Sequence, residues 1–129
     1  MLQFSPNLIA TADINPYAIV KMSTTAFSGS ASTAAADYVV GVADGSTSRF
    51  NTTVHAAAGD PISLQPSNCV QLKCGASTAI TAGLGLIAST AGVAITAAGS
   101  GNVPLFVALE PAAVDSIFWA YRLPSVKAL

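Results

Sequence analysis

A pair of apolar runs separated by a proline constrains the fold of this chain more than any other feature. The segment 103–126 reads VPLFVALEPAAVDSIFWAYRLPSV and holds the only tryptophan, Trp119. Pro111 disfavours helical backbone at Glu110 and has no N–H to donate to a sheet ladder, so the first run must end there. The second run starts after Asp115. The segment is therefore predicted to form two β-strands joined by a short corner flanked by acids, with Trp119 in a core strand.

The same pattern occurs earlier in the chain, which indicates an internal repeat. Three pairs of segments resemble one another: 38–44 and 104–110, 58–64 and 113–119, and 14–20 and 80–86. The second pair aligns Asp60 with Asp115. We predict two degenerate copies of one β unit, about 12–68 and 78–125, with ten additional residues of the first copy lying within 45–55. Chance likeness between short Ala- and Val-rich strings is the alternative.

Turn signals at close spacing divide the rest of the chain into short β-type runs. Asp44-Gly45 and Pro66-Ser67-Asn68 each follow such a run. Residues 23–36 are rich in Ser, Thr, Ala and Gly and are predicted to form a surface loop. Seven or eight short strands at this spacing are typical of a small, compact all-β barrel or sandwich. Residues 12–129 are interpreted as a single β domain.

The first eleven residues carry apolar side chains without a regular period, and Pro6 interrupts them. A frayed terminus is one interpretation. The other is an extended N-terminal arm, residues 1–11, that docks on a neighbouring protein, and its apolar side chains favour this second interpretation: Leu2, Phe4, Leu8 and Ile9.

The chain is poor in charge. Charged residues make up 9% of the sequence and the net charge is −1, whereas about a quarter of an average soluble protein is charged. The five basic residues are scattered, so binding to nucleic-acid phosphates is not expected. A surface with so little charge tends to associate, which suits a protein that functions in an assembly.

The uncharged segment 74–109 is long enough to raise the question of a membrane span. Six glycines and several Ser and Thr residues interrupt it, and its apolar residues alternate with small or polar ones, which is the period of a strand. The N-terminus also lacks the basic start of a signal peptide. Neither membrane insertion nor secretion is expected.

The residues that could carry chemistry are few. His55 is the only histidine. On one strand Cys69 and Cys74 would point to opposite faces about 16 Å apart, so no disulfide is expected and both are interpreted as buried free thiols. A Cys–His nucleophile pair would need His55 beside one of them, with Asp60 to orient it, and the spacing does not support this. Asp60 and Asp115 are expected to accept backbone N–H groups at equivalent turns. No metal site, cofactor site or enzymatic activity is predicted.

Three segments resemble a known family. They are 79–83 (AITAG), 92–97 (GVAITA) and 107–113 (VALEPAA). Together they are similar to the small head decoration, or capsid cement, proteins of tailed bacteriophages, and the resemblance extends over about residues 12–123. Phe106 and Val114 stand where the family pattern has glycine.

This resemblance implies a fold of the β-clip or β-tulip type and a viral structural function. Such proteins cluster as homotrimers on the outside of the expanded capsid, bridge major capsid subunits and stabilise the head. The implied location is the outer surface of the virion, after assembly in the host cytoplasm. The implied partners are the major capsid protein and further copies of the chain, with no nucleic acid, membrane or cofactor. The apolar residues of the arm would contact the capsid, and Phe50 and Glu110 would contact other subunits.

Three other functions are weighed against this one. A fibre or adhesin-type module that binds a surface receptor or a glycan would need exposed aromatic side chains, for which Phe50 and Trp119 are the candidates. A small Cys or Ser hydrolase would need a nucleophile motif, and no G-x-S-x-G turn occurs. A membrane protein is the third.

Overall fold

The computed structural model describes residues 8–32, 39–48, 52–97 and 103–124. Within them the chain forms ten β-strands and one 3-10 turn, η1 (Thr90–Gly92), which confirms the predicted all-β class. No helix among the described residues has the length and apolar character needed to cross a bilayer. The strands are β1 (Leu8–Ala10), β2 (Ile19–Met22), β3 (Ser28–Ala31), β4 (Val39–Val42), β5 (Pro61–Ile62), β6 (Cys69–Lys73), β7 (Gly85–Ala88), β8 (Ala94–Thr96), β9 (Phe106–Ala108) and β10 (Ile117–Arg122).

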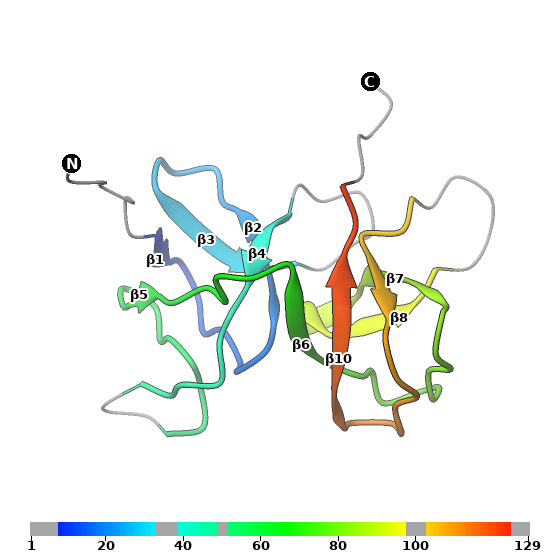
Figure 1. The fold of residues 1–129 in the computed structure, drawn as a ribbon. Coiled ribbons are helices and arrows are strands. Elements are labelled where there is room, and N and C mark those ends of the chain that lie inside the picture. Colours follow the sequence, from blue (N-terminus) through cyan, green and yellow to red (C-terminus); the bar gives the residue numbers. More distant parts are fainter. Residues whose placement is uncertain (1–7, 33–38, 49–51, 98–102, 125–129) are drawn as a thin grey trace.

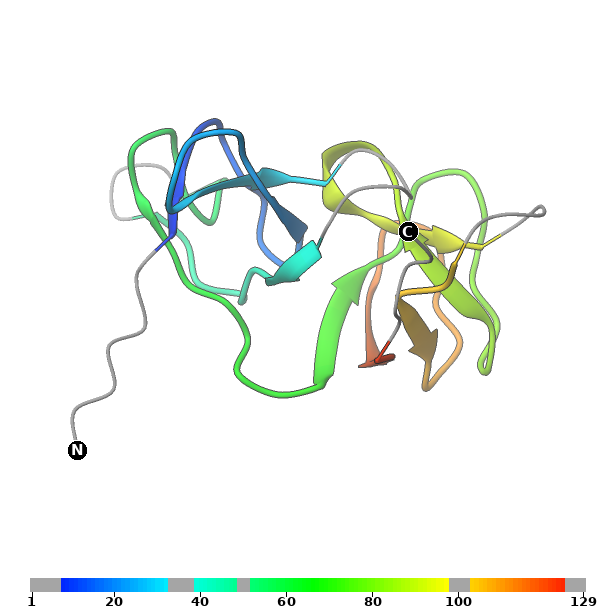
Figure 2. The same cartoon turned by 90° about the horizontal axis from the view of Figure 1, so that it is seen from above.

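The strands form two five-stranded sheets that divide the chain into halves lying side by side (Figures 1 and 2). The first unit, residues 8–65, has the order β4-β2-β3-β1-β5, and the second unit, residues 69–123, has the order β6-β10-β9-β7-β8. Isolated bridges join the two ends of each sheet: Ala43 with Leu64 in the first unit, and Cys74 with Ala94 in the second. Each sheet therefore curls until its two edges meet at a single bridge.

The two units share one pairing scheme. β2 pairs with β3 and β4 as β7 pairs with β8 and β9, and β1 pairs with β5 as β6 pairs with β10. β1 also runs parallel to β3, and the equivalent contact in the second unit is the parallel bridge between Cys74 and Ala94. Even the isolated bridge of Ile14 with Ala56 has a counterpart, Ile80 with Ala112. The two units therefore repeat the same pattern of strand pairing.

The strand pairing places the boundaries of the two repeat units at other residues than predicted. Leu8 pairs with Ile62 as Leu72 pairs with Phe118, so the first unit begins at β1 and not at residue 12. The segment Leu8–Ala10, predicted to belong to a free arm, is a strand inside the first sheet. The second unit likewise begins with β6 and not at residue 78.

The predicted equivalence of Asp60 with Asp115 is wrong by one residue. Ala56 corresponds to Ala112, so Asp60 corresponds to Ser116 and Gly59 to Asp115. Gly59 and Asp115 both have a positive φ, 93° and 60°, because the turn before the last strand needs left-handed backbone, which Gly and Asp tolerate best. The first unit has eleven residues, 45–55, where the second has two, 110–111.

β3 is a strand that the sequence did not predict. Its residues read SGSA and were assigned to a surface loop, because Ser, Gly and Ala have weak strand preference. The strand forms because β2 and β1 offer hydrogen-bonding edges on both sides of it. Pairing with the neighbouring strands therefore outweighs the weak intrinsic strand preference of these residues.

Each unit has its own apolar core, built from equivalent positions. The first core contains small side chains at many of them, and the second replaces several with larger ones, such as Phe118 for Ile62 and Leu86 for Val20. Ile19 and Val42 belong to strands of the first unit but pack into the core of the second. The interface between the units is therefore continuous with the second core.

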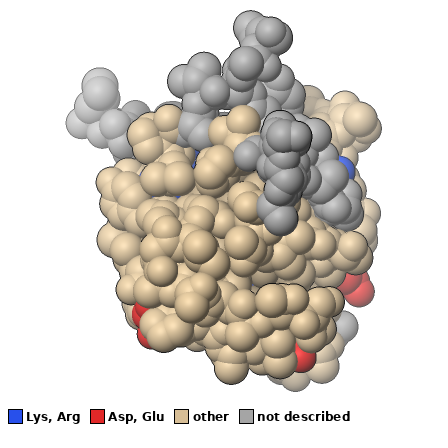
Figure 3. Space-filling model, turned by 90° about the vertical axis from the view of Figure 1, so that its right-hand side faces the viewer, with Lys and Arg blue, Asp and Glu red and all other residues tan. Residues whose placement is uncertain are grey.

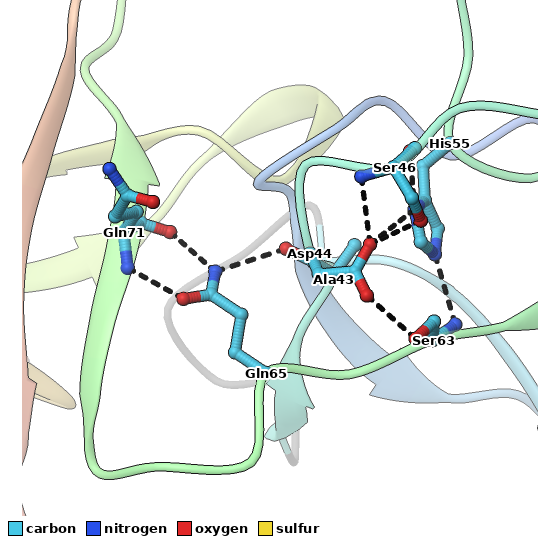
Figure 4. Close-up of polar contacts among 7 residues, drawn as sticks. All are labelled: Ala43, Asp44, Ser46, His55, Ser63, Gln65 and Gln71. Atoms are coloured by element: carbon cyan, nitrogen blue, oxygen red, sulfur yellow. Dashed lines mark hydrogen bonds and ion pairs between the residues drawn. The ribbon is translucent and has the colours of Figure 1, made fainter.

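Polar contacts fix the two units together. The guanidinium of Arg122 donates to the carbonyls of Val39 (3.0 Å) and Val40 (3.3 Å). The side chain of Gln65 links the units in a second place, because its Nε2 donates to the carbonyls of Ala43 (3.1 Å) and Gln71 (2.8 Å) while its Oε1 accepts from the Gln71 N–H (2.8 Å; Figure 4). The amide of Gln65 thus pairs with β6 as the backbone of another strand would.

Candidate functional site

The long insertion of the first unit builds a polar network around Asp44. The Asp44 carboxylate accepts hydrogen bonds from the Ser46 N–H (2.8 Å), from the Ser46 hydroxyl and from the Ser63 hydroxyl (2.6 Å; Figure 4). Ser46 lies at the start of the insertion and Ser63 follows β5. Asp44 follows β4, where its own N–H donates to the Ser63 carbonyl (2.9 Å). The network therefore joins the insertion to the outer side of the last strand.

His55 completes this network from the buried end of the insertion. The His55 side chain is only 2% exposed. Nδ1 contacts the Ser46 carbonyl (2.8 Å), and Nε2 accepts the N–H of Ser63 (3.0 Å), so the proton of the ring sits on Nδ1. Asp44 Oδ1 lies 3.4 Å from Nδ1. Both ring nitrogens are thus engaged with the backbone, and neither is free to take a proton from a nucleophile.

Hydrogen bonding controls the ionisation of Asp44. Partial burial opposes the charge, but the hydrogen bonds from Ser46 and Ser63, with a smaller contribution from His55, outweigh it and hold the pKa of Asp44 below its ordinary value. The network is therefore built around an ionised carboxylate.

The arrangement differs from the Cys–His pair that was considered. Asp44, and not Asp60, lies beside His55. The thiol of Cys74 lies in the second unit and contacts the Thr78 carbonyl (3.5 Å). Asp60 accepts the N–H of Ala57 (3.1 Å) at its turn, as predicted. The described residues contain no group of three His, Cys, Asp or Glu side chains arranged to hold a metal ion.

A shallow pocket of about 440 Å³ lies beside the network. Four of its seven lining residues carry a hydroxyl group, and three of these hydroxyls donate to the carboxylates of Asp44 and Asp60. Its lining residues are Ser46, Thr47, Ser48, His55, Asp60, Pro61 and Ser63.

The equivalent surface of the second unit is apolar. The ladder matches Asp44, Pro61, Ser63 and Gln65 with Leu109, Ile117, Trp119 and Tyr121. These four side chains, which we call the Trp119 stripe, are all exposed, Trp119 by 46% and Leu109 by 52%. The stripe follows the outward positions of β10, whose inward positions hold Phe118 and Ala120.

Glu110 lies at the edge of this stripe. Its carboxylate accepts the N–H of Trp119 (2.9 Å), which is the same backbone position that His55 satisfies at Ser63 in the first unit. Glu110 is exposed, and its contact with other subunits stays a prediction. In the two units, the backbone N–H at this strand position is therefore accepted by different side chains, His55 in the first unit and Glu110 in the second.

The other predicted contact residues fall in two groups. Leu8 is half-buried and packs against the first core, and Ile9 is 39% exposed on β1. Leu2, Phe4 and Phe50 lie outside the described residues.

The orientation of Trp119 within its core strand could not be predicted from the sequence. Its strand is as predicted, but its side chain points outward and not into the core. The run IFWAYR allows two alternating faces, and the run alone does not say which of them is buried. The Asp44–His55–Ser63 network was also missed, because the contacts depend on how the insertion folds back.

The cysteines behave differently from each other. Cys74 is buried and free, as predicted, and burial together with the charge of Asp115 raises the pKa of its thiol. Cys69 is free but exposed, contrary to the prediction. It lies at an outward position of β6, opposite Tyr121.

Comparisons with known proteins support the fold. Neither the protein families nor the curated protein sequences give a match. Among solved structures, the chain is similar to the N base of head fiber gp8.5 in bacteriophage phi29, with a TM-score of 0.64 over 92% of each chain at 14% sequence identity. The likeness covers both units and establishes a shared fold.

Proposed function

We propose that this chain is a structural protein of a tailed-phage virion and attaches to the outside of the head. The observation that carries the proposal is the likeness of the whole fold to a head fiber base. The independent sequence resemblance of 79–83, 92–97 and 107–113 to head decoration proteins supports the same location. A fold alone does not determine function, so the agreement of the two lines of argument matters.

Under this proposal the chain acts as a decoration protein. It binds the major capsid protein of the expanded shell, bridges neighbouring subunits and stabilises the head, and it assembles there as a homotrimer. The low content of charged residues supports a function within an assembly, because proteins with little surface charge tend to associate. The predicted capsid contacts of Leu2 and Phe4 are part of the proposal.

Co-sedimentation with expanded, undecorated heads of the encoding phage tests the proposal. We expect saturable binding at a fixed ratio to the major capsid protein, and heads that withstand a higher temperature. Binding without heat resistance would favour the base of a fibre over a cement role. Absence of binding would contradict attachment to the head.

The role of the predicted arm needs a modified truncation. Because Leu8–Ala10 forms a strand in the first sheet, deleting residues 1–11 would damage the fold. Deleting residues 1–7 leaves that strand in place. Loss of head binding with an unchanged circular dichroism spectrum would support a docking function for the arm, and unchanged binding would contradict it.

A second function is favoured by one observation. Trp119 and Tyr121 are exposed aromatic side chains on one strand face, which is what a fibre or adhesin-type module that binds a glycan would need. A screen of host cell-surface glycans tests this alternative, with specific binding as the supporting result.

A further inference from the structure

We propose that the Trp119 stripe is the surface with which this protein docks on an apolar, uncharged polypeptide surface of the head shell. This inference rests on the proposed function and adds to it the contact surface and the chemistry of the partner.

The first unit serves as an internal control for the stripe. At the four equivalent positions it carries Asp44, Pro61, Ser63 and Gln65, and the three polar ones form hydrogen bonds within the chain. The same ladder therefore forms without large apolar side chains at these positions. Folding does not account for the apolar residues in the second unit.

The composition of the stripe resembles the centre of a protein interface. Trp and Tyr are the residues that most often dominate binding energy, and charged residues are depleted at interface centres. Its charged neighbours lie on opposite sides of β10: Lys73 on β6, paired with Ile117, and Glu110 after β9. The side of the second unit that Figure 3 shows exposes little charge. The matching partner surface is therefore apolar at its centre.

The area of the stripe argues against a stable dimer through this face. With 39–52% of each side chain exposed, the four residues offer on the order of 300 Å². A stable interface buries about 800 Å² on each partner. Weak contacts become strong together when the copies that make them are linked to one another, and the proposed homotrimer would bring three stripes to one ordered surface in this way. A head shell provides such a surface, and a second copy of this chain does not.

The chemistry of the stripe also favours a protein over a glycan. Sugar recognition needs polar groups that converge on the ligand. The N–H of Trp119 is already taken by Glu110, and the other backbone groups along β10 face β6 and β9 in the ladder. Two of the four side chains, Leu109 and Ile117, are aliphatic and have no hydrogen bond to offer.

The test compares three variants in head co-sedimentation. Trp119→Thr and Ile117→Thr each remove an apolar side chain and keep a residue that favours strands. Phe27→Ala is the matched control, because Phe27 is a more exposed aromatic side chain, 59%, on the first unit. We expect at least tenfold weaker head binding for Trp119→Thr, a smaller loss for Ile117→Thr, and wild-type binding for Phe27→Ala. Circular dichroism and thermal unfolding identify any variant that fails to fold, in which case Ile117→Thr carries the test.

The outcomes separate this inference from the proposed function. Wild-type protein that does not bind heads overturns the proposed function and the inference with it. Wild-type protein that binds, with folded Trp119→Thr and Ile117→Thr binding equally well, overturns the inference alone. Loss of only self-association, measured by light scattering, or of only glycan binding in these variants would also overturn it, since the stripe would then serve another partner.

Discussion

Ser63 and Trp119 occupy the same position in the two units, and the backbone N–H of each donates to a side chain from the preceding corner. His55 Nε2 accepts from Ser63 at 3.0 Å, and Glu110 Oε2 accepts from Trp119 at 2.9 Å. In the first unit the acceptor is a buried ring reached through a long insertion, and in the second it is an exposed carboxylate on a two-residue corner. These two hydrogen bonds should contribute differently to the free energy of unfolding.

Replacing His55 should destabilise the protein more than replacing Glu110. His55→Ala removes a buried ring and leaves two backbone partners without their acceptor or donor, which we expect to lower the free energy of unfolding by about 2–4 kcal/mol. Glu110→Ala removes one exposed acceptor and should cost under about 1 kcal/mol. Urea denaturation of both variants measures this, and equal losses would contradict the role assigned to the His55 ring.

Acid should weaken the Asp44 network. The folded-state pKa of Asp44 lies below the ordinary value of 3.8, so the ionised form contributes stability that is fully present above the unfolded-state pKa. That contribution is lost as the pH falls from about 5 through the folded-state pKa. Asp44→Asn should be less stable than the wild type at neutral pH, and the difference should shrink on acidification. Unfolding curves at pH 7, 5 and 3 measure it; a difference that stays constant would argue against an ionised Asp44 at the centre of the network.

Two glycines with similar backbone should differ sharply when changed to alanine. Gly83 and Gly92 have φ values of +85° and +77°, but a Cβ at Gly83 meets open space, whereas one at Gly92 lies 2.8 Å from the Ile19 carbonyl and the Ala18 Cβ. Gly83→Ala should cost about 1–2 kcal/mol for the left-handed backbone. Gly92→Ala adds a steric clash of about 1–3 kcal/mol. Thermal unfolding compares the two variants. Equal decreases in Tm would mean that the backbone around Ile19 moves to accommodate the Cβ at Gly92 at little cost.

The two thiols should label separately. Cys69 is exposed, whereas Cys74 is buried and its pKa is raised, so it forms little thiolate at neutral pH. A thiol reagent should modify one cysteine in the native protein and a second only after denaturation. In Cys69→Ala the fast reaction should disappear. A fast native reaction that persists there would show that Cys74 is accessible.

The sequence predicted the fold class because alternation and turn residues are local signals. Pro111 ended a strand region as predicted, and the likeness of 104–110 to 38–44 reflected a real correspondence between β9 and β4. The strand β3 was missed because its SGSA side chains give no local signal, and only the edges of β1 and β2 make it a strand.

The candidate sites were harder to predict because they depend on contacts between distant residues. Ser63 and Asp44 are nineteen residues apart and meet only when the first sheet curls. The outward orientation of Trp119 depends on which face of β10 meets the second core, and the sequence IFWAYR is compatible with either. The strand β1 was assigned to a free arm because its partner, β5, lies more than fifty residues away.

The order of strands also has a consequence for how the chain folds as it is synthesised. In each unit the first strand pairs with the last, β1 with β5 and β6 with β10, so neither unit can close until its final strand has left the ribosome. The first unit can close while the second is still being made. Until then Ile19 and Val42, which belong to the second core, lack the cover that the second unit provides. A fragment that ends near residue 68 should therefore lack this cover over Ile19 and Val42 and should tend to associate.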